Sequence, residues 1–210
     1  HPLLLESLLY PGHLDDRFNI ESLKQELDIQ LRNVAGDIEL ELDVLRQFKR
    51  AQTIVIATAE IAEEIDTIQV SHYLSDLAEI ILQAVYELSR KEINALYGEP
   101  GCIIDGKTMT PHLGIIAYGK LGGFELHYQS DLDIIFLHNS SGSQQQSVGP
   151  KVIDNPVYFS RLAQKIISKI TLLTAAGKLY EIDTRLRPDG ASGMLVSALA
   201  AYRKYQHEKA

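Results

Sequence analysis

The chain has 210 residues, of which 45% are hydrophobic and 23% are charged, and its net charge is −8. This composition is typical of a globular protein and excludes a disordered chain; no apolar run approaches the roughly 20 residues that a membrane-spanning helix needs. The single cysteine, Cys102, excludes an internal disulfide and is typical of a reducing cytoplasm. Because the chain begins at His1 and lacks an initial Met, we expect a fragment of a longer protein.

The charge is unevenly distributed between the two halves of the chain. Residues 1–100 contain 19 acidic and 8 basic side chains, whereas residues 101–210 contain 9 acidic and 12 basic ones. An acidic protein is poorly suited to wrapping duplex nucleic acid, so we expect no nucleic-acid partner and disfavour a polymerase. We also expect no membrane partner. The basic second half can attract a small anion such as a nucleotide.

The first hundred residues are predicted to be helical. Apolar residues recur there at spacings of three and four, and glycine is sparse. Asn19 can cap the first helix, and Gly98 with Pro100 ends the last one. The predicted helices cover residues 20–34, 37–64 and 70–97. Long amphipathic helices bury their apolar stripes by packing together, so residues 1–100 are predicted to form a helical bundle.

The sequence pattern changes after Pro100, where short apolar runs alternate with glycine-rich and polar segments. The predicted strands cover residues 112–118, 131–138, 178–187 and 194–196, and the predicted helices cover residues 156–175 and 197–208. Loops are predicted at residues 101–111, 188–193 and 139–151, the last of them polar and mobile. This order of elements predicts an α+β or α/β domain over residues 101–210.

Two aspartates at the start of the strand predicted over residues 131–138 carry the sharpest chemical signal. Side chains alternate between the faces of a strand, so Asp131 and Asp133 are expected to point the same way. Two neighbouring carboxylates repel each other unless a hard cation such as Mg²⁺, which prefers oxygen ligands, lies between them. Taken alone, the pair is equally well explained as two solvated aspartates.

A second motif reads Tyr-Glu-Ile-Asp-Thr-Arg-Leu-Arg-Pro over residues 180–188. Alternation along a strand would place Glu181, Asp183, Arg185 and Arg187 on one face. An acid beside two arginines suits a metal–phosphate site, because guanidinium groups fit phosphate oxygens. By itself, an exposed strand face held by ion pairs is the favoured explanation.

A glycine-rich turn lies about ten residues before the aspartate pair. Gly119 lets the backbone approach an anion, and Lys120 adds positive charge, although the segment matches neither GxxxxGK[ST] nor GxGxxG. Taken together, the three motifs predict one site. The turn would hold phosphates, and three aspartates would hold two metal ions for in-line displacement at phosphorus.

These residues resemble a known superfamily, the DNA polymerase β-type nucleotidyltransferases. Longer strings are similar to the glutamine-synthetase adenylyltransferase family and cover nearly the whole chain: LRQFKRAQTIVIATAEIAEE, YGKLGGFELHYQSDLDIIFLHN and LYEIDTRLRPDGASGMLVSALAAYRKYQ. Members carry an N-terminal module that removes AMP and a C-terminal module that adds it, and SDLDIIFLHN and EIDTRLRPDGASGMLV look more like the adenylylating one. The resemblance implies an α+β fold, with a helical bundle packed on a nucleotidyltransferase domain that has a small mixed sheet.

The resemblance also implies a role for each candidate residue. Asp131 and Asp133 match the metal-binding pair, and Asp183 matches the third acid, which ligates the metal and helps deprotonate the acceptor. The remaining matches face the nucleotide: Gly119 and Lys120 in the phosphate-facing turn, Ser130 close by, and Arg185 and Arg187 near the phosphates. The implied reaction uses two Mg²⁺ ions and ATP, and a tyrosine hydroxyl of glutamine synthetase attacks the α-phosphorus. A PII-type signal protein is expected to bind outside this chain.

Other functions remain open at this point. The same carboxylates would serve removal of AMP by phosphate, and a uridylyl- or small-molecule transferase would need them too. A nucleotide-sensing module without turnover is disfavoured because all three acids are present. For the basic cluster Arg46, Lys49 and Arg50, ion pairing within the chain is favoured over contact with nucleotide or glutamine synthetase.

Overall fold

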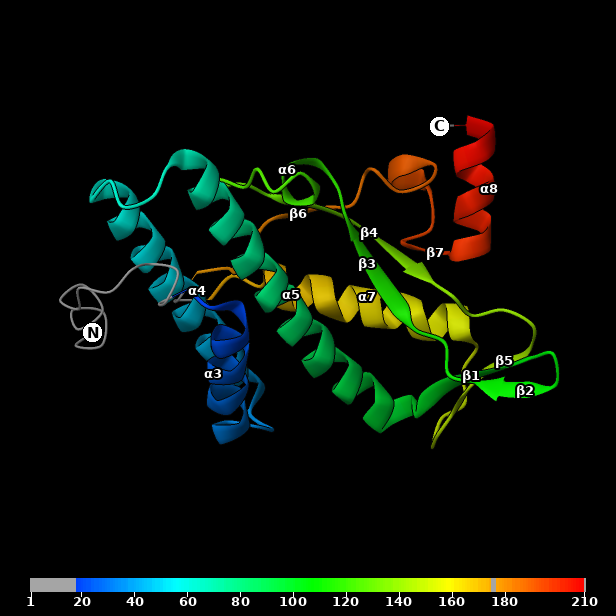
Figure 1. The fold of residues 1–210 in the computed structure, drawn as a ribbon. Coiled ribbons are helices and arrows are strands. Elements are labelled where there is room, and N and C mark those ends of the chain that lie inside the picture. The colour runs from blue at the N-terminus through cyan, green and yellow to red at the C-terminus, as the bar shows by residue number, and fades with distance from the viewer. Residues whose placement is uncertain (1–17, 175–176, 210) are drawn as a thin grey trace. The chain divides into compact units, whose positions relative to one another are not determined.

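The computed structural model of the protein describes residues 18–174 and 177–209 (Figure 1). It mixes helices with small sheets, which agrees with the predicted α+β class. Contacts divide the chain into two compact units. Unit 1 takes the described residues up to Ala84 together with those of 123–130 and 171–181, and unit 2 takes the rest. The predicted domain boundary at residue 100 stays a prediction.

Unit 1 is built from the predicted helices. These are α3 (Ile20–Asn33), α4 (Ile38–Ile61) and the first part of α5 (Thr67–Tyr97). The Asn19 side chain accepts a hydrogen bond from the Ser22 amide at 3.0 Å, which confirms the predicted cap, and Asp37 caps α4 in the same way. The apolar stripes of these helices supply the buried core of the unit, including Leu27, Leu45, Ile56, Leu77 and Ile81.

Two residues of the basic cluster on α4 bind residues 172, 179 and 180 of the same unit. Buried Arg46 donates to the carbonyl of Leu172 at 3.0 Å and pairs with Asp43 at 3.3 Å. Lys49 donates to the carbonyl of Leu179 at 2.6 Å, and its ammonium lies 4.0 Å from the centre of the Tyr180 ring. The predicted ion pairing is therefore found for Arg46, whereas Lys49 binds a carbonyl and an aromatic face.

Unit 2 contains two sheets. In the first, β1 (Glu99–Ile104) lies between β2 (Lys107–Met109) and β5 (Ser143–Val148), and both pairings are antiparallel. In the second, β3 (Leu113–Ala117) pairs antiparallel with β4 (Leu132–His138), while β6 (Ile182–Asp183) and β7 (Val196–Ala198) pair with β4 in parallel. Strand β4 is thus the centre of a small mixed sheet.

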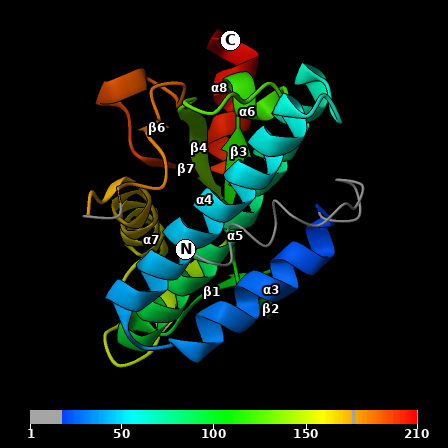
Figure 2. The same ribbon diagram turned by 90° about the vertical axis from the view of Figure 1, so that its left-hand side faces the viewer.

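Strand β4 and helix α7 (Asn155–Thr171) form the core of unit 2. Leu132, Ile134 and Ile135 are fully buried in β4, and Phe159 of α7 stacks on His138 with ring centres 4.9 Å apart. The end of α5 is joined to α7 by an ion pair of 2.6 Å between Glu92 and Lys169. Helix α8 (Leu199–Lys209) follows β7 directly and contacts the same sheet (Figure 2).

Three sequence predictions about the second half are wrong in part. Residues 101–111 are not a loop, because Asp105 and Gly106 have positive φ angles and form the tight turn of the β1–β2 hairpin. Residues 139–151 contain strand β5, whose polar side chains suit an exposed edge. The predicted strand over residues 178–187 shrinks to Ile182–Asp183, because the chain turns directly afterwards.

None of the helices in the described ranges combines the length and the apolar character that crossing a bilayer requires.

Candidate active site

Three carboxylates converge at one end of strand β4. Each of Asp131, Asp133 and Asp183 offers an oxygen, and these oxygens all lie within 4.8 Å of one another. The register explains the meeting, because Asp133 of β4 is the direct parallel partner of Asp183 in β6. Asp131 lies two residues before Asp133, so its side chain falls on the same side of the chain. The fold therefore brings together acids that are 50 positions apart in the sequence.

The electrostatics of this acid cluster suit a hard divalent cation. Partial burial raises the pKa of Asp133, and the charges of Asp131 and Asp183 raise it further. A carboxylate that is partly desolvated and surrounded by like charges gains when a cation neutralises the group. Three oxygen donors within reach of one point are the ligand type that Mg²⁺ prefers. The donor set of this chain therefore fits Mg²⁺.

Gly119 lies directly against the acid cluster. Its φ is +52°, and a Cβ atom built on it would lie 2.2 Å from Oδ2 of Asp133, so a larger residue would displace that carboxylate. The preceding amide, that of Tyr118, donates to the carbonyl of Asp133 at 2.8 Å and extends the β3–β4 pairing. Glycine therefore adopts this conformation without strain and leaves the Asp133 carboxylate in place. Lys120 follows it as an exposed cation whose charge acts to lower the pKa of Asp133.

Arg185 is the cation in closest contact with the cluster. Its Nε lies 3.0 Å from Oδ1 and 2.7 Å from Oδ2 of Asp183, and its Nη2 pairs with Oδ2. Its backbone amide also donates to Oδ1, at 2.8 Å. These hydrogen bonds, rather than burial, set the electrostatics of Asp183, and they lower the pKa of its carboxyl group.

The other two predicted nucleotide-binding residues have structural partners. Arg187 donates to the carbonyls of Thr184 at 2.8 Å, Ala191 at 3.2 Å and Gly193 at 3.4 Å, so its guanidinium shapes the loop after β6. The expectation that Arg187 shares a strand face with Asp183 is wrong, because the chain turns after Asp183. The hydroxyl of Ser130 accepts from the amide of His127 at 3.0 Å and closes a turn just before Asp131.

Comparison with known proteins identifies the family. All 210 residues match the family model described as Glutamate-ammonia ligase adenylyltransferase. The chain belongs to this family. The resemblance to the glutamine-synthetase adenylyltransferase family is thereby confirmed.

Three relatives carry the name "Bifunctional glutamine synthetase adenylyltransferase/adenylyl-removing enzyme". The chain is 48% identical to the protein of Thioalkalivibrio sulfidiphilus over 100% of its own length and 22% of that protein. It is 42% identical to that of Methylococcus capsulatus, again over 100% and 22%, and 41% identical to that of Nitrosococcus oceani over 98% and 21%. The chain thus spans about a fifth of the length of these adenylyltransferases.

Sequence reasoning missed one contact beside the glycine turn. The hydroxyl groups of Tyr118 and Tyr202 are hydrogen-bonded, and Gln206 donates to the Tyr202 hydroxyl at 2.8 Å. This contact joins α8 to the residue just before Gly119, and it raises the pKa of Tyr118 to about 12. No sequence signal pairs residues that are 84 positions apart, so the contact could be found only in the fold.

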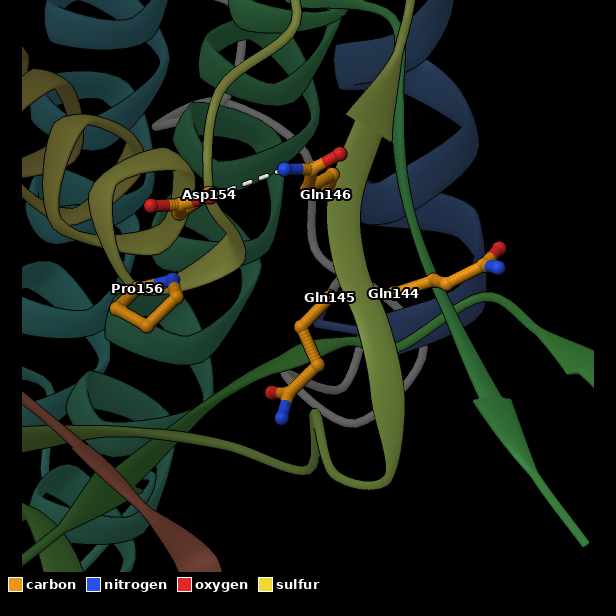
Figure 3. A pocket seen from close by; sticks show the side chains of 5 residues that line it. All are labelled: Gln144, Gln145, Gln146, Asp154 and Pro156. Atoms are coloured by element: carbon orange, nitrogen blue, oxygen red, sulfur yellow. Dashed lines mark hydrogen bonds between the residues drawn. The ribbon is translucent and has the colours of Figure 1, made fainter.

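A separate hollow lies on strand β5 and the start of α7. It has a volume of about 480 Å³ and is lined by Gln144, Gln145, Gln146, Asp154 and Pro156 (Figure 3). The Gln146 amide donates to Asp154 at 3.4 Å across it. None of the residues predicted for the nucleotidyltransferase site lines this hollow.

Proposed function

We propose that this chain is the adenylylating module of its family and transfers AMP from ATP to a tyrosine hydroxyl of glutamine synthetase. The convergence of three carboxylates on the Gly119 turn is the observation that carries the proposal. The names of the relatives support the acceptor, glutamine synthetase, and the group transferred. A nucleotidyltransferase arrangement around the mixed sheet, a cytoplasmic location and a PII-type regulator bound elsewhere belong to the same proposal.

The carboxylates would organise the reacting groups. Asp131, Asp133 and Asp183 would hold Mg²⁺, two ions in all, and the metal when bound supplies neutralising charge to the phosphate oxygens. Gly119 leaves the space that the Asp133 carboxylate occupies, so the acids lie directly against the turn that would face the phosphates. Lys120 and Arg185 add positive charge beside the acids, where charge develops on the transferring group.

The proposed chemistry is an in-line displacement. The tyrosine oxygen forms a bond to the α-phosphorus of ATP, and the bond between that phosphorus and the bridging oxygen to the β-phosphate breaks. Pyrophosphate leaves with the electron pair, and a carboxylate oxygen of Asp183 accepts the hydroxyl proton. Orientation of the two substrates supplies a large part of the acceleration in such sites.

The second candidate is the reverse task, removal of AMP by phosphate, since the names of the relatives cover both activities. The same carboxylates would serve it. The strings around Asp131 and Asp183 favour addition, because they look more like the adenylylating module.

Intact-mass spectrometry tests the proposal. Glutamine synthetase incubated with the purified protein, Mg²⁺ and ATP is expected to gain one adenylyl group per subunit. The substitution Asp133→Asn, which removes a carboxylate oxygen without changing size, is expected to reduce turnover roughly 100-fold or more. The matched control is Asp28→Asn on the exposed surface of α3, which should keep full activity.

Two outcomes would contradict this assignment. Full activity of Asp133→Asn would remove the acid cluster from the mechanism. Loss of AMP from adenylylated glutamine synthetase on addition of phosphate, without any forward transfer, would establish the second candidate in its place.

A further inference from the structure

Asp183 differs from the other two acids of the cluster in its hydrogen bonds. Both of its oxygens are engaged by Arg185, through Nε at 2.7 and 3.0 Å, through Nη2, and through the backbone amide at 2.8 Å. Within residues 18–174 and 177–209, no side-chain hydrogen bond of this kind reaches the carboxylate of Asp131 or Asp133. Arg185 therefore binds Asp183, which is the acid of the cluster that lies on β6.

This pairing competes with metal binding. A carboxylate has about four lone-pair positions, and the contacts from Arg185 use them on both oxygens. A cation that takes Asp183 as a ligand must therefore displace at least the guanidinium. The two partners also differ in exposure to solvent: the Asp183 side chain is 14% exposed, whereas that of Arg185 is 78% exposed. The carboxylate is thus fixed in the fold, and the arginine is the partner that is free to move.

We propose that Arg185 is an exchangeable counter-ion, which occupies Asp183 in the absence of nucleotide and transfers to the triphosphate when ATP enters. The inference rests on the proposed function, since it takes the acid cluster to be the metal site. A guanidinium fork fits a phosphate as well as a carboxylate, so Arg185 exchanges one anionic partner for another. Asp183 then becomes available as the third ligand only when the substrate is present.

Arg187 cannot replace Arg185 in this role. Three carbonyls of the loop over residues 184–193 hold its guanidinium, so its movement would disrupt that loop. The exchange therefore depends on one residue. Since coupling between two ligands is reciprocal, nucleotide should strengthen metal binding by the same factor as metal strengthens nucleotide binding.

Titration with Mn²⁺ followed by electron paramagnetic resonance tests the exchange without any turnover. In the wild-type protein, a non-hydrolysable ATP analogue is expected to tighten Mn²⁺ binding by a factor in the range of roughly 5 to 150, as is usual for coupled sites. The variant Arg185→Gln is expected to bind Mn²⁺ alone at least about fivefold more tightly than wild type. Its coupling factor should be smaller than that of wild type, because only the direct attraction between metal and phosphate remains.

Removal of any positive charge near the acid cluster also strengthens the binding of a cation. A second variant that loses a charge, but not the hydrogen bonds to Asp183, is therefore needed as a control. Lys120→Gln removes a cation that acts on the same cluster but makes no hydrogen bond to Asp183. The proposal predicts a clearly smaller gain in Mn²⁺ affinity for Lys120→Gln than for Arg185→Gln. Equal gains in the two variants, or no gain in Arg185→Gln, would overturn it.

A second comparison separates this inference from the proposed function. The double variant Asp131→Asn with Asp133→Asn defines the Mn²⁺ binding that comes from elsewhere in the protein. If wild type binds no more Mn²⁺ than this double variant even with nucleotide, the metal site itself is wrong, and the proposed function fails with it. If wild type binds more, but Arg185→Gln changes neither the affinity nor the coupling, only the exchange by Arg185 is wrong.

Discussion

At the scale of single residues, the site depends on how closely backbone and carboxylate approach. Gly119 and Asp133 leave no room for a further methyl group, because a Cβ at Gly119 would overlap Oδ2 of Asp133. The spacing of Asp131 and Asp133 was enough to predict that both face the same way. The sequence did not reveal that Arg185 covers Asp183, since that contact depends on the turn which the chain makes after β6.

Substitution of Gly119 by Ala is expected to impair the site more than the fold. The residue adopts φ +52°, which costs an alanine roughly 1–2 kcal/mol, and the new methyl group displaces the Asp133 carboxylate. We expect turnover to fall at least about tenfold, since misplacement of a reacting group by about 1 Å can cost 100-fold. Steady-state kinetics and urea unfolding measure the two effects separately.

Gly106→Ala is the matched control for this variant. Gly106 also has a positive φ, +76°, but nothing lies within 4 Å of a Cβ built on it. The Gly106→Ala variant should therefore lose a similar amount of unfolding free energy and keep the turnover of the wild-type protein. Equal losses of turnover in both variants would mean that backbone strain, rather than contact with Asp133, explains the effect.

At the level of helices and strands, the pairing of strands within each sheet decides which residues come into contact. The predicted helices of unit 1 were confirmed because each carries a strong apolar period and two begin at good caps, Asn19 and Asp37. The β1–β2 hairpin carried a recognisable signal, the Asp105–Gly106 pair, which the prediction overlooked. Strand β5 carried no such signal, since an exposed edge strand can be almost wholly polar.

The attachment of segment 171–181 to α4 should depend on pH through Lys49. Burial lowers the pKa of Lys49 from 10.5 to about 8, and the charge of Arg50 adds to the effect. Between these pH values the unfolded chain binds a proton that the folded chain has already lost, so stability rises with pH in this window. The contribution is present above pH 10.5 and is lost as the pH falls through about 8.

The variant Lys49→Met isolates this contribution because methionine keeps the apolar part of the side chain. The unfolding free energy of wild type minus that of Lys49→Met is expected to increase from about pH 8 to about pH 10.5 in urea titrations. Other titrating groups cancel in the difference. A difference that stays constant or decreases over this range would contradict the lowered pKa.

At the scale of the whole molecule, family membership and the acid cluster point to the same chemistry. The family follows from a match over all 210 residues. The acid cluster follows independently from the geometry, in which the β4–β6 register pairs Asp133 with Asp183 and Asp131 lies nearby. The sequence allowed the cluster to be predicted because two of its acids share one strand. The meeting of β4 with β6 was a hypothesis that rested on the combined chemistry of the three motifs, since no local pattern pairs strands that are 50 residues apart.

Asp131, Asp133 and Asp183 are proposed to form the metal centre at which ATP binds. Crystals grown with Mn²⁺ and a non-hydrolysable ATP analogue test it directly, because anomalous scattering locates manganese independently of the refined coordinates. We expect an anomalous peak within bonding distance of all three carboxylates, with the triphosphate beside Gly119. A nucleotide bound elsewhere, or a cluster without manganese while nucleotide is present, would contradict it.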